Sequence, residues 1–231
     1  MLEFWLWRHP RPIGAAGRCI GRTDLALDHR RAKRLAHQIR RAARRHQLPR
    51  QIWTSALQRC ALVGRQLARW GWMHRIDDRL QELDFGHWDG QPWSAIAPAE
   101  VAAWEADFAH HAPGGAESLA ALRRRCLGFC TDQAALPPAE QVALPPANPA
   151  ALRPADPAAL PLAGPGPGAS PAAAVQRGAL APVVVKAVLV VGHAGWINAL
   201  GLARTAPWSA AAWPAAPGYG QLRRQTLLPD T

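Results

Sequence analysis

The chain is short enough for one domain, apolar enough to fold, and strongly basic. Its 231 residues are 49% hydrophobic and 19% charged, and 27 Lys and Arg against 16 Asp and Glu give a net charge of +11. This length fits a single domain spanning 1–231, with enough apolar residues for a core. The charge excludes an acidic, solvating chain and indicates an anionic partner.

Neither membrane insertion nor secretion is expected. The longest apolar run, Val183–Val191, is interrupted by Lys186 and is shorter than the ~18 residues typical of a membrane span. The apolar start of the chain has no basic segment ahead of it, so it does not resemble a secretory signal. The four cysteines form no Cys-x-x-Cys pair and are interpreted as reduced thiols. We therefore predict a cytoplasmic protein with no membrane partner.

Strand and helix patterns alternate along the chain. Leu2–Trp7 is apolar and aromatic, which predicts a strand. After a candidate N-cap at Asp28, apolar residues recur at helical spacing as far as Ala43 and predict an amphipathic helix. Further strands are predicted at 51–54 and 183–191, and further helices at 56–70, 94–109, 117–130 and from 196 onward. This alternation predicts a layered α/β domain.

The segment 134–182 differs in composition from the rest of the chain. Its 49 residues include 17 Ala and 12 Pro, with no aromatic residue and no His. Proline removes backbone donors and fixes φ, so neither a helix nor a sheet continues through this spacing. With few large side chains, little burial offsets the entropy of ordering the segment. We predict a low-complexity, disordered Ala/Pro-rich insertion within the domain.

Most of the excess positive charge lies in one predicted helix. Nine basic residues and no acidic residue lie between Arg30 and Arg50. Such a cluster is compatible with nucleic-acid binding. However, arginine outnumbers lysine 25 to two in the whole chain, and no nucleic-acid-binding signature accompanies the helix. The sequence therefore favours a solvated helix face and does not favour nucleic acid as a partner.

Two predicted strands each end in a histidine. His9 follows the first strand directly after Arg8, and His193 follows the strand that begins at Val183. In open α/β sheets, ligands bind beyond the carboxyl ends of the strands. One such histidine has an ordinary interpretation in a turn or a core, but two of them, one beside an arginine, favour a functional site.

Four stretches carry the candidate site. Arg8-His9-Pro10 ends the first strand, Ser55–Arg59 reads Ser-x-Leu-x-Arg, Leu80–Gly90 reads LQELDFGHWDG with Glu82 third, and His193 ends a late strand. In order and spacing they resemble the motifs of the histidine phosphatase superfamily, whose founding members are the cofactor-dependent phosphoglycerate mutases. The resemblance covers most of the chain except the insertion. It implies a three-layer αβα sandwich of the phosphoglycerate-mutase-like type.

The resemblance also implies a metal-independent phosphomonoesterase without a cofactor, acting on a small-molecule phosphate monoester. A neutral His9 would attack phosphorus and form a phosphohistidine. Arg8 and Arg59 would hold the phosphoryl oxygens through forked donors. His193 would donate to an equatorial oxygen, and Glu82 would protonate the leaving alkoxide and then deprotonate the attacking water. The positive charges of Arg8 and Arg59 would neutralise the phosphoryl group, as Mg²⁺ does in other phosphoryl-transfer sites.

Further contacts are implied at the rim of the site. Arg22, Glu117 and Ser118 would contact phosphate or substrate, and Asp84 is the alternative to the neighbouring glutamate as general acid. A closer resemblance links residues 8–27 to the α-ribazole-phosphate phosphatase branch, whose members often read Cys-Tyr-Gly-Arg-Thr-Asp where this chain reads CIGRTD. We therefore expect α-ribazole 5′-phosphate, in the assembly of cobalamin, as the substrate.

The sequence departs from the family pattern at three positions. Pro10 replaces a glycine and has no backbone N–H to offer phosphate. Asp89 replaces a glutamate and keeps the charge on a shorter side chain, and Ile20 replaces an aromatic residue near the substrate entrance. Cys126 and Cys130 are interpreted as half-buried helix packing, and the tryptophans at 88, 93 and 104 as core or pocket wall in preference to a base-stacking platform.

Two alternatives stay open. One is a phosphatase of broad specificity for sugar phosphates or nucleotides; the pocket around Ile20 and the segment Trp93–Ser118 would distinguish it. The other belongs to a different class: a catalytically inactive protein that binds anions or nucleic acid through the helix at 30–50. A mutase is less favoured, because it needs a pocket that retains the dephosphorylated intermediate. The oligomeric state is not predicted.

Overall fold

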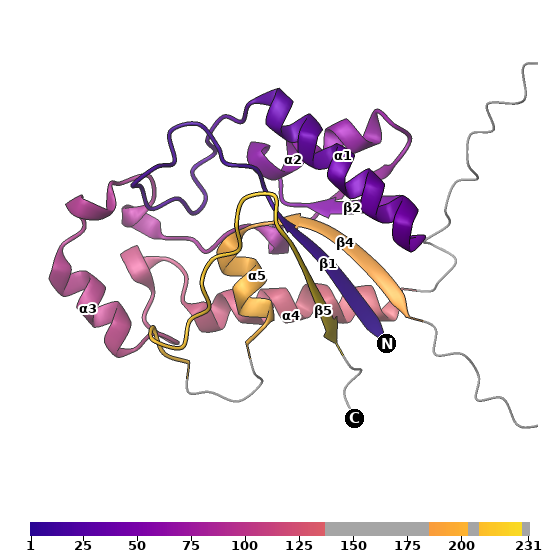
Figure 1. Cartoon of the computed structure of the whole chain (residues 1–231). Coiled ribbons are helices and arrows are strands. Elements are labelled where there is room, and N and C mark those ends of the chain that lie inside the picture. Colours follow the sequence, from indigo (N-terminus) through magenta and orange to yellow (C-terminus); the bar gives the residue numbers. More distant parts are fainter. Residues whose placement is uncertain (137–184, 203–207, 228–231) are drawn as a thin grey trace, which may run out of the picture. The chain divides into compact units, whose positions relative to one another are not determined.

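A five-stranded sheet forms the centre of the fold. The computed structural model describes residues 1–136, 185–202 and 208–227. The strands are β1 (Leu2–Arg8), β2 (Gln51–Thr54), β3 (Met73–Ile76), β4 (Lys186–Gly192) and β5 (Leu222–Leu227), in the order β3-β2-β4-β1-β5 (Figure 1). β5 runs antiparallel to β1, whereas the other pairs are parallel.

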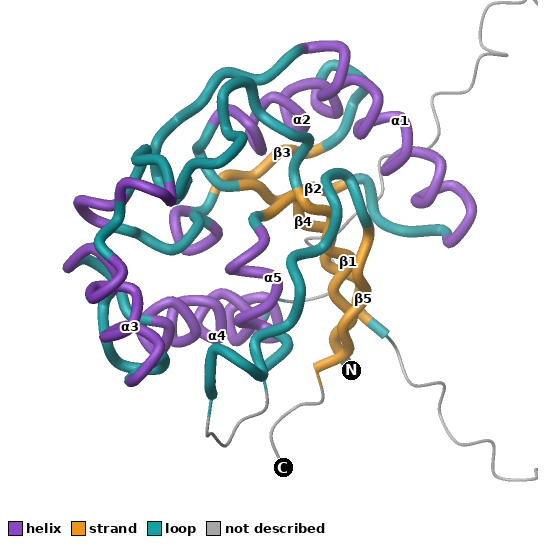
Figure 2. The backbone as a smooth tube through the Cα atoms, turned by 60° about the vertical axis from the view of Figure 1, so that its left-hand side comes forward, coloured by secondary structure: helices purple, strands orange, loops and turns teal. Residues whose placement is uncertain are grey.

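Helices cover both faces of this sheet. They are α1 (His29–His46), α2 (Gln58–Ala68), α3 (Pro98–Ala106), α4 (Leu119–Ala135) and α5 (Ala194–Leu200). α1 and α2 lie on one side of the sheet, and α4 and α5 lie on the other (Figure 2). One core cluster joins the sheet to α1 and α2, and another joins it to α4 and α5. The predicted three-layer αβα fold is confirmed. Among the described helices, none is both long and apolar enough to span a membrane.

The first strand supplies both core clusters because its side chains alternate between faces. Phe4 and Leu6 belong to the cluster with α4 and α5, while Trp5 and Trp7 belong to the cluster with α1 and α2. All four are buried. Since β1 is hydrogen-bonded on both edges and packed on both faces, its C-terminal end is a rigid position for a functional side chain.

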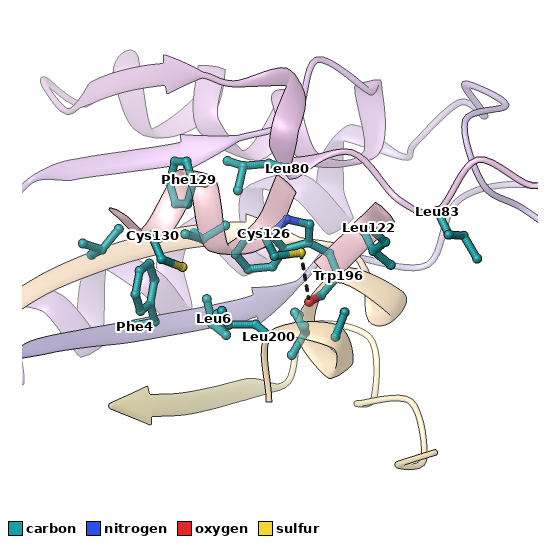
Figure 3. Packing of buried hydrophobic residues seen from close by; sticks show 14 of the residues in the cluster. Phe4, Leu6, Leu80, Leu83, Leu122, Cys126, Phe129, Cys130, Trp196 and Leu200 are labelled. Carbon is teal, nitrogen blue, oxygen red and sulfur yellow. Dashed lines mark hydrogen bonds between the residues drawn. The ribbon is translucent and has the colours of Figure 1, made fainter. Parts of the chain in front are cut away.

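Cys126 and Cys130 lie in the core cluster that joins the sheet to α4 and α5 (Figure 3). Cys126 and Cys130 are 0% and 4% exposed and lie among Phe4, Phe129 and Trp196. Burial raises the pKa of both thiols, because it disfavours the thiolate. Their interpretation as packing residues is confirmed, but both are buried and not half-buried as predicted.

Helix α1 begins and packs as the sequence predicts. Asp28 accepts a hydrogen bond from the Arg30 backbone N–H at 2.8 Å and caps the helix. The buried side chains are those of Ala32, Leu35, Ala36, Ile39 and Ala43, while most of the basic residues are exposed. An amphipathic helix with a solvated basic face is therefore the observed arrangement.

Other predicted bounds need correction. The helix predicted at 94–109 is wrong in its first part, because a short 3₁₀ turn at Trp93–Ala95 precedes α3, which starts at Pro98; proline is favoured in the first turn of a helix. α2 begins at Gln58, two residues later than predicted. α4 extends past Cys130 to Ala135, and so takes up the first residues of the predicted insertion. Residues 137–182 of that insertion lie outside the described residues.

Candidate active site

A cavity of about 380 Å³ opens where β1 and β4 end. Its polar lining comprises three arginines, one histidine, one carboxylate and one phenol: Arg8, Arg18, Arg59, His9, Glu82 and Tyr219. Four of the five predicted catalytic residues therefore border one cavity. The fifth, His193, lies behind it.

The sheet brings the two strand-end histidines together. β1 and β4 are parallel neighbours, and their register pairs Arg8 with Gly192. The next residue of each strand is a histidine, so His9 and His193 lie side by side with ring centroids 5.1 Å apart. The backbone N–H of His9 also donates to the Gly192 carbonyl at 2.9 Å. Two short sequences far apart in the chain thus form one cluster.

The ring of His9 is held in a defined tautomer. Its Nδ1 lies 2.8 Å from the Pro10 carbonyl oxygen. A carbonyl only accepts, so Nδ1 carries the proton and Nε2 keeps its lone pair. Proline at position 10 removes an N–H but retains this carbonyl. Burial, then Arg59 and Arg8, lower the pKa of His9 from 6.5 to about 3, so the ring is neutral near pH 7.

This depressed pKa predicts a loss of stability in acid. Because the folded-state pKa lies below the ordinary value of 6.5, the unfolded chain binds more protons between about pH 3 and 6.5, and stability falls as the pH falls through that window. We expect His9→Gln to reduce the difference in unfolding free energy between pH 7 and pH 4.5 by ~2–3 kcal/mol. Urea unfolding at both pH values measures this. A pH difference that is unchanged in His9→Gln would contradict the expectation.

Arg59 connects the cavity to a neighbouring loop. It is 1% exposed, and its Nη1 donates to the Thr23 carbonyl at 2.7 Å, while Nη2 donates to the Gly21 carbonyl. The same loop is fixed from its other side by Asp89, whose carboxylate accepts from the backbone N–H groups of residues 21, 22 and 23 at 2.7–2.8 Å. The shorter aspartate at this position therefore still caps three consecutive donors.

The side chain of Arg8 makes one hydrogen bond within the described part of the chain and leaves its Nε donor unpaired there. Its Nη1 donates to the Pro217 carbonyl at 2.7 Å, and its Cζ lies 3.9 Å from the centre of the Tyr219 ring. Its Nε is buried and has no hydrogen-bond partner among the described residues. An unpaired buried donor of this kind costs free energy until an acceptor satisfies it. A guanidinium with a free donor beside a neutral histidine suits an anionic ligand.

Glu82 is held by backbone donors at the other side of the cavity. Its carboxylate accepts from the N–H groups of Leu83 at 3.0 Å, Gly195 at 3.0 Å and Trp196 at 3.2 Å. Two of these donors belong to the first turn of α5, which starts directly after His193. The carboxylate is therefore fixed relative to the histidine pair. Asp84, the alternative acid, does not line the cavity and lies 3.4 Å from Arg22.

His193 is completely buried, and both of its ring nitrogens are engaged. Its Nδ1 accepts from Arg59 Nε at 3.3 Å, so Nε2 carries the proton and donates to Ser55 Oγ at 2.8 Å. Burial, then Arg59 and His9, hold the pKa of His193 well below 6.5. The predicted donation from His193 to a phosphoryl oxygen stays a prediction. What the geometry provides is a contact that orients Arg59.

Three predicted rim contacts lie outside the cavity lining. Arg22 is paired with Asp84 and Glu117, and Glu117 is also bound to Arg125 Nε at 2.7 Å. Ser118 caps α4 by accepting from the Ala121 N–H at 3.2 Å. These contacts account for the residues structurally, and their predicted contact with substrate stays a prediction.

The sequence did not single out Arg18, Trp213 or Tyr219 as part of the site. Arg18 donates to the Gly90 carbonyl at 2.9 Å and lines the cavity. Trp213 and Tyr219 come from the segment before β5. None carries a local motif, and the only available signal for the tyrosine was that it is the single Tyr of the chain.

The remainder of the lining is apolar and largely aromatic. The segment Trp93–Ser118 contributes Trp93, Trp104 and Phe108, and the rest of the wall includes Ile20, Leu83, Phe85, Leu119, Leu122 and Trp213. Trp104 and Phe108 stack with ring centroids 5.1 Å apart. The interpretation of Trp93 and Trp104 as pocket wall, and of Trp88 as core, is confirmed.

No group of three or more His, Cys, Asp or Glu side chains in the described ranges is arranged to hold a metal ion. The expectation that catalysis needs neither a metal nor a cofactor stays a prediction.

Comparisons with known proteins agree with this geometry. The family model described as histidine phosphatase superfamily (branch 1) matches residues 4–145. A mycobacterial glucosyl-3-phosphoglycerate phosphatase structure is 22% identical, covers 96% of this chain and 88% of its own, and has a TM-score of 0.62. The protein TTHB049 of Thermus thermophilus is 21% identical, with 96% and 92% covered and a TM-score of 0.55. At these identities the structures show the fold. No curated protein sequence matches the chain.

Proposed function

The chain belongs to the histidine phosphatase superfamily, branch 1, and on this premise we propose that it is a phosphomonoesterase that works through a phosphohistidine on His9. The observation that carries the proposal is the neutral His9, whose proton is on Nδ1, so that Nε2 keeps the lone pair that a nucleophile needs. Arg8 and Arg59 beside it supply positive charge without protonating it. An anionic nucleophile would be repelled by a phosphate dianion, whereas a neutral imidazole is not.

The first half-reaction uses residues on both sides of the cavity. His9 Nε2 forms a bond to phosphorus while the bond between phosphorus and the alcohol oxygen breaks. Arg8 and Arg59 hold the phosphoryl oxygens as charge develops on them. Glu82 donates its proton to the leaving oxygen, and the alcohol departs.

The second half-reaction reverses these roles. Glu82, now a carboxylate, takes a proton from water as the water oxygen bonds to phosphorus. The bond between phosphorus and His9 breaks, inorganic phosphate leaves and the imidazole is restored. The backbone donors that fix the carboxylate keep it within reach for both transfers.

We propose α-ribazole 5′-phosphate, a ribose phosphate that carries a benzimidazole base, as the substrate, in the assembly of cobalamin. The CIGRTD motif and the aromatic wall support this choice. A planar base would bury apolar surface against the aromatic wall that includes Trp104, whereas a sugar offers little apolar surface. The principal alternative is a sugar-phosphate phosphatase, because one structural neighbour is described as acting on glucosyl-3-phosphoglycerate.

The reaction is tested by trapping the intermediate. The protein is mixed with a ³²P-labelled phosphate monoester in excess chelator and quenched in alkali, where phosphohistidine survives. We expect label on the protein that is lost in acid. Turnover without any labelled protein would contradict the phosphohistidine mechanism.

The substrate proposal is tested with a pair of esters that share one leaving group. α-Ribazole 5′-phosphate and ribose 5-phosphate both release a ribose 5′-hydroxyl, so they differ only in the base. We expect kcat/KM to be ~10–100-fold higher for the first. Trp104→Ala should lower kcat/KM for α-ribazole 5′-phosphate by about tenfold and leave ribose 5-phosphate within about twofold.

A tryptophan outside the cavity provides the matched control. Trp70 is half-buried beside His37 and Arg40 and does not line the cavity. Trp70→Ala should leave the ratio of the two kcat/KM values unchanged. Equal kcat/KM values for both esters in the wild type would favour the sugar-phosphate alternative.

A further inference from the structure

The turn that precedes β5 is fixed to the residue before the candidate nucleophile. The Arg8 backbone N–H donates to the Gln221 carbonyl at 3.1 Å, and the Gly220 N–H donates to the Arg8 carbonyl at 2.9 Å. Gln221 N–H closes the turn on the Gly218 carbonyl at 3.0 Å, and Gly220 takes a positive φ of 74° that favours glycine. Tyr219 is therefore placed by the sheet itself.

The same turn makes two contacts with the side chain of Arg8. The Pro217 carbonyl accepts a hydrogen bond from Nη1 at 2.7 Å, and the centre of the Tyr219 ring lies 3.9 Å from Cζ. An aromatic face attracts a cation over it and restricts where the guanidinium plane lies. An unrestrained arginine side chain populates many rotamers, and restricting it to one costs conformational entropy when phosphate binds. A side chain that is already restrained holds the phosphate in one geometry at a lower cost.

The ring also lies next to the candidate nucleophile. The centroids of the His9 and Tyr219 rings are 5.6 Å apart, and Tyr219 lines the cavity while 41% of its surface stays exposed. One ring thus contacts both members of the Arg8-His9 pair from the solvent side. It comes from a segment beyond residues 4–145, which the family model matches.

We propose that Tyr219 is a positioning residue that holds the Arg8 guanidinium in place for the phosphoryl group. This inference rests on the proposed phosphatase function. The contribution lies in the face of the ring, and the hydroxyl is not needed. The residue acts through Arg8, so its effect should disappear when Arg8 is absent.

The test compares two substitutions at this position. Tyr219→Phe keeps the ring, and Tyr219→Leu removes it while keeping apolar bulk. We expect Tyr219→Leu to lower kcat/KM for an aryl phosphate about tenfold and to weaken inhibition by orthovanadate by a similar factor, whereas Tyr219→Phe stays within about threefold of the wild type. Equal values for Tyr219→Leu and wild type, or an equal loss in both variants, would overturn the proposal.

A double-mutant cycle shows whether Tyr219 acts through Arg8. The dissociation constant for inorganic phosphate is measured by calorimetry for wild type, Tyr219→Leu, Arg8→Ala and the double variant. We expect Tyr219→Leu to weaken binding about tenfold in the wild type and less than about twofold when Arg8 is already absent. Penalties that simply multiply would show a structural role and overturn the proposal.

The phosphate measurement separates this inference from the proposed function. A wild type that binds phosphate but hydrolyses no ester would contradict the phosphatase, while the cycle would still decide the role of Tyr219. A wild type that neither hydrolyses esters nor binds phosphate would overturn both. Arg45→Ala, a change in an exposed basic residue of α1 remote from the cavity lining, is the control for lost positive charge.

Discussion

Replacing His9 with alanine should slow the hydrolysis of an aryl phosphate by ~10³–10⁵-fold. The reason is that His9 Nε2 is the proposed nucleophile, and the other ring nitrogen, Nδ1, is already hydrogen-bonded to the Pro10 carbonyl. His193, although its ring lies 5.1 Å away, cannot replace it, because both of its nitrogens are bound. Initial rates in the presence of a chelator measure the effect.

The control for this experiment is a histidine that is remote from the site. His29 is exposed at the start of α1, so His29→Ala should retain the wild-type rate. His9→Ala should also give no acid-labile protein label. A His9→Ala protein with near-wild-type activity would contradict the mechanism, and activity lost on chelation in the wild type would point to a metal.

Replacing Arg59 should damage both catalysis and folding. Arg59→Ala removes a proposed donor to the phosphoryl group, and it leaves two loop carbonyls and His193 Nδ1 buried without their partner. We expect kcat/KM to fall by ~10²–10³-fold and the unfolding free energy to fall by ~2–4 kcal/mol. Denaturant unfolding and kinetics on the folded protein measure the two effects separately.

Arg59→Lys distinguishes charge from geometry at this position. Lysine keeps the positive charge but cannot bind two loop carbonyls, the histidine and a phosphoryl group with one planar fork. We therefore expect Arg59→Lys to recover some stability but less than a tenth of the wild-type kcat/KM. Full activity in Arg59→Lys would mean that charge alone suffices.

The sequence predicts well those parts of the molecule that are determined locally. α1 is recognisable because Asp28 caps it and one apolar stripe faces the sheet, and β2 is found at 51–54 as predicted. The strand-end histidines meet because parallel neighbouring strands end at the same edge, which places His9 next to His193. The superfamily also follows from short motifs, since each one surrounds a side chain of the cavity or its support.

The two edge strands, β3 and β5, were not predicted from the sequence, for a physical reason. Three of the four residues of β3 are exposed, and no residue of β5 is fully buried. An edge strand that faces solvent lacks the continuous apolar run by which β4 is recognised. Because β5 was not predicted, the turn before it and its Tyr219 could not be placed near Arg8.

The wall of the cavity was predicted only in outline. Trp93 and Trp104 come from the segment that the sequence marks as decisive, but Trp213 reaches the same cavity from more than a hundred residues later in the chain. Arg22 shows the opposite case: its motif suggests a ligand contact, yet it is paired with Asp84 and Glu117. Local motifs do not show which partner a long charged side chain reaches after folding.

The position of β1 in the sheet has a consequence for how the chain folds during synthesis. β1 emerges first, but both of its neighbours, β4 and β5, come from the last part of the chain. At a synthesis rate of about 5–20 residues per second, the apolar strand β1 stays unpaired for ~10–40 s until β4 and β5 have been made. Sheets that depend on such distant pairings close slowly. His9 and His193 therefore come together only after β4, which is made late, has paired with β1.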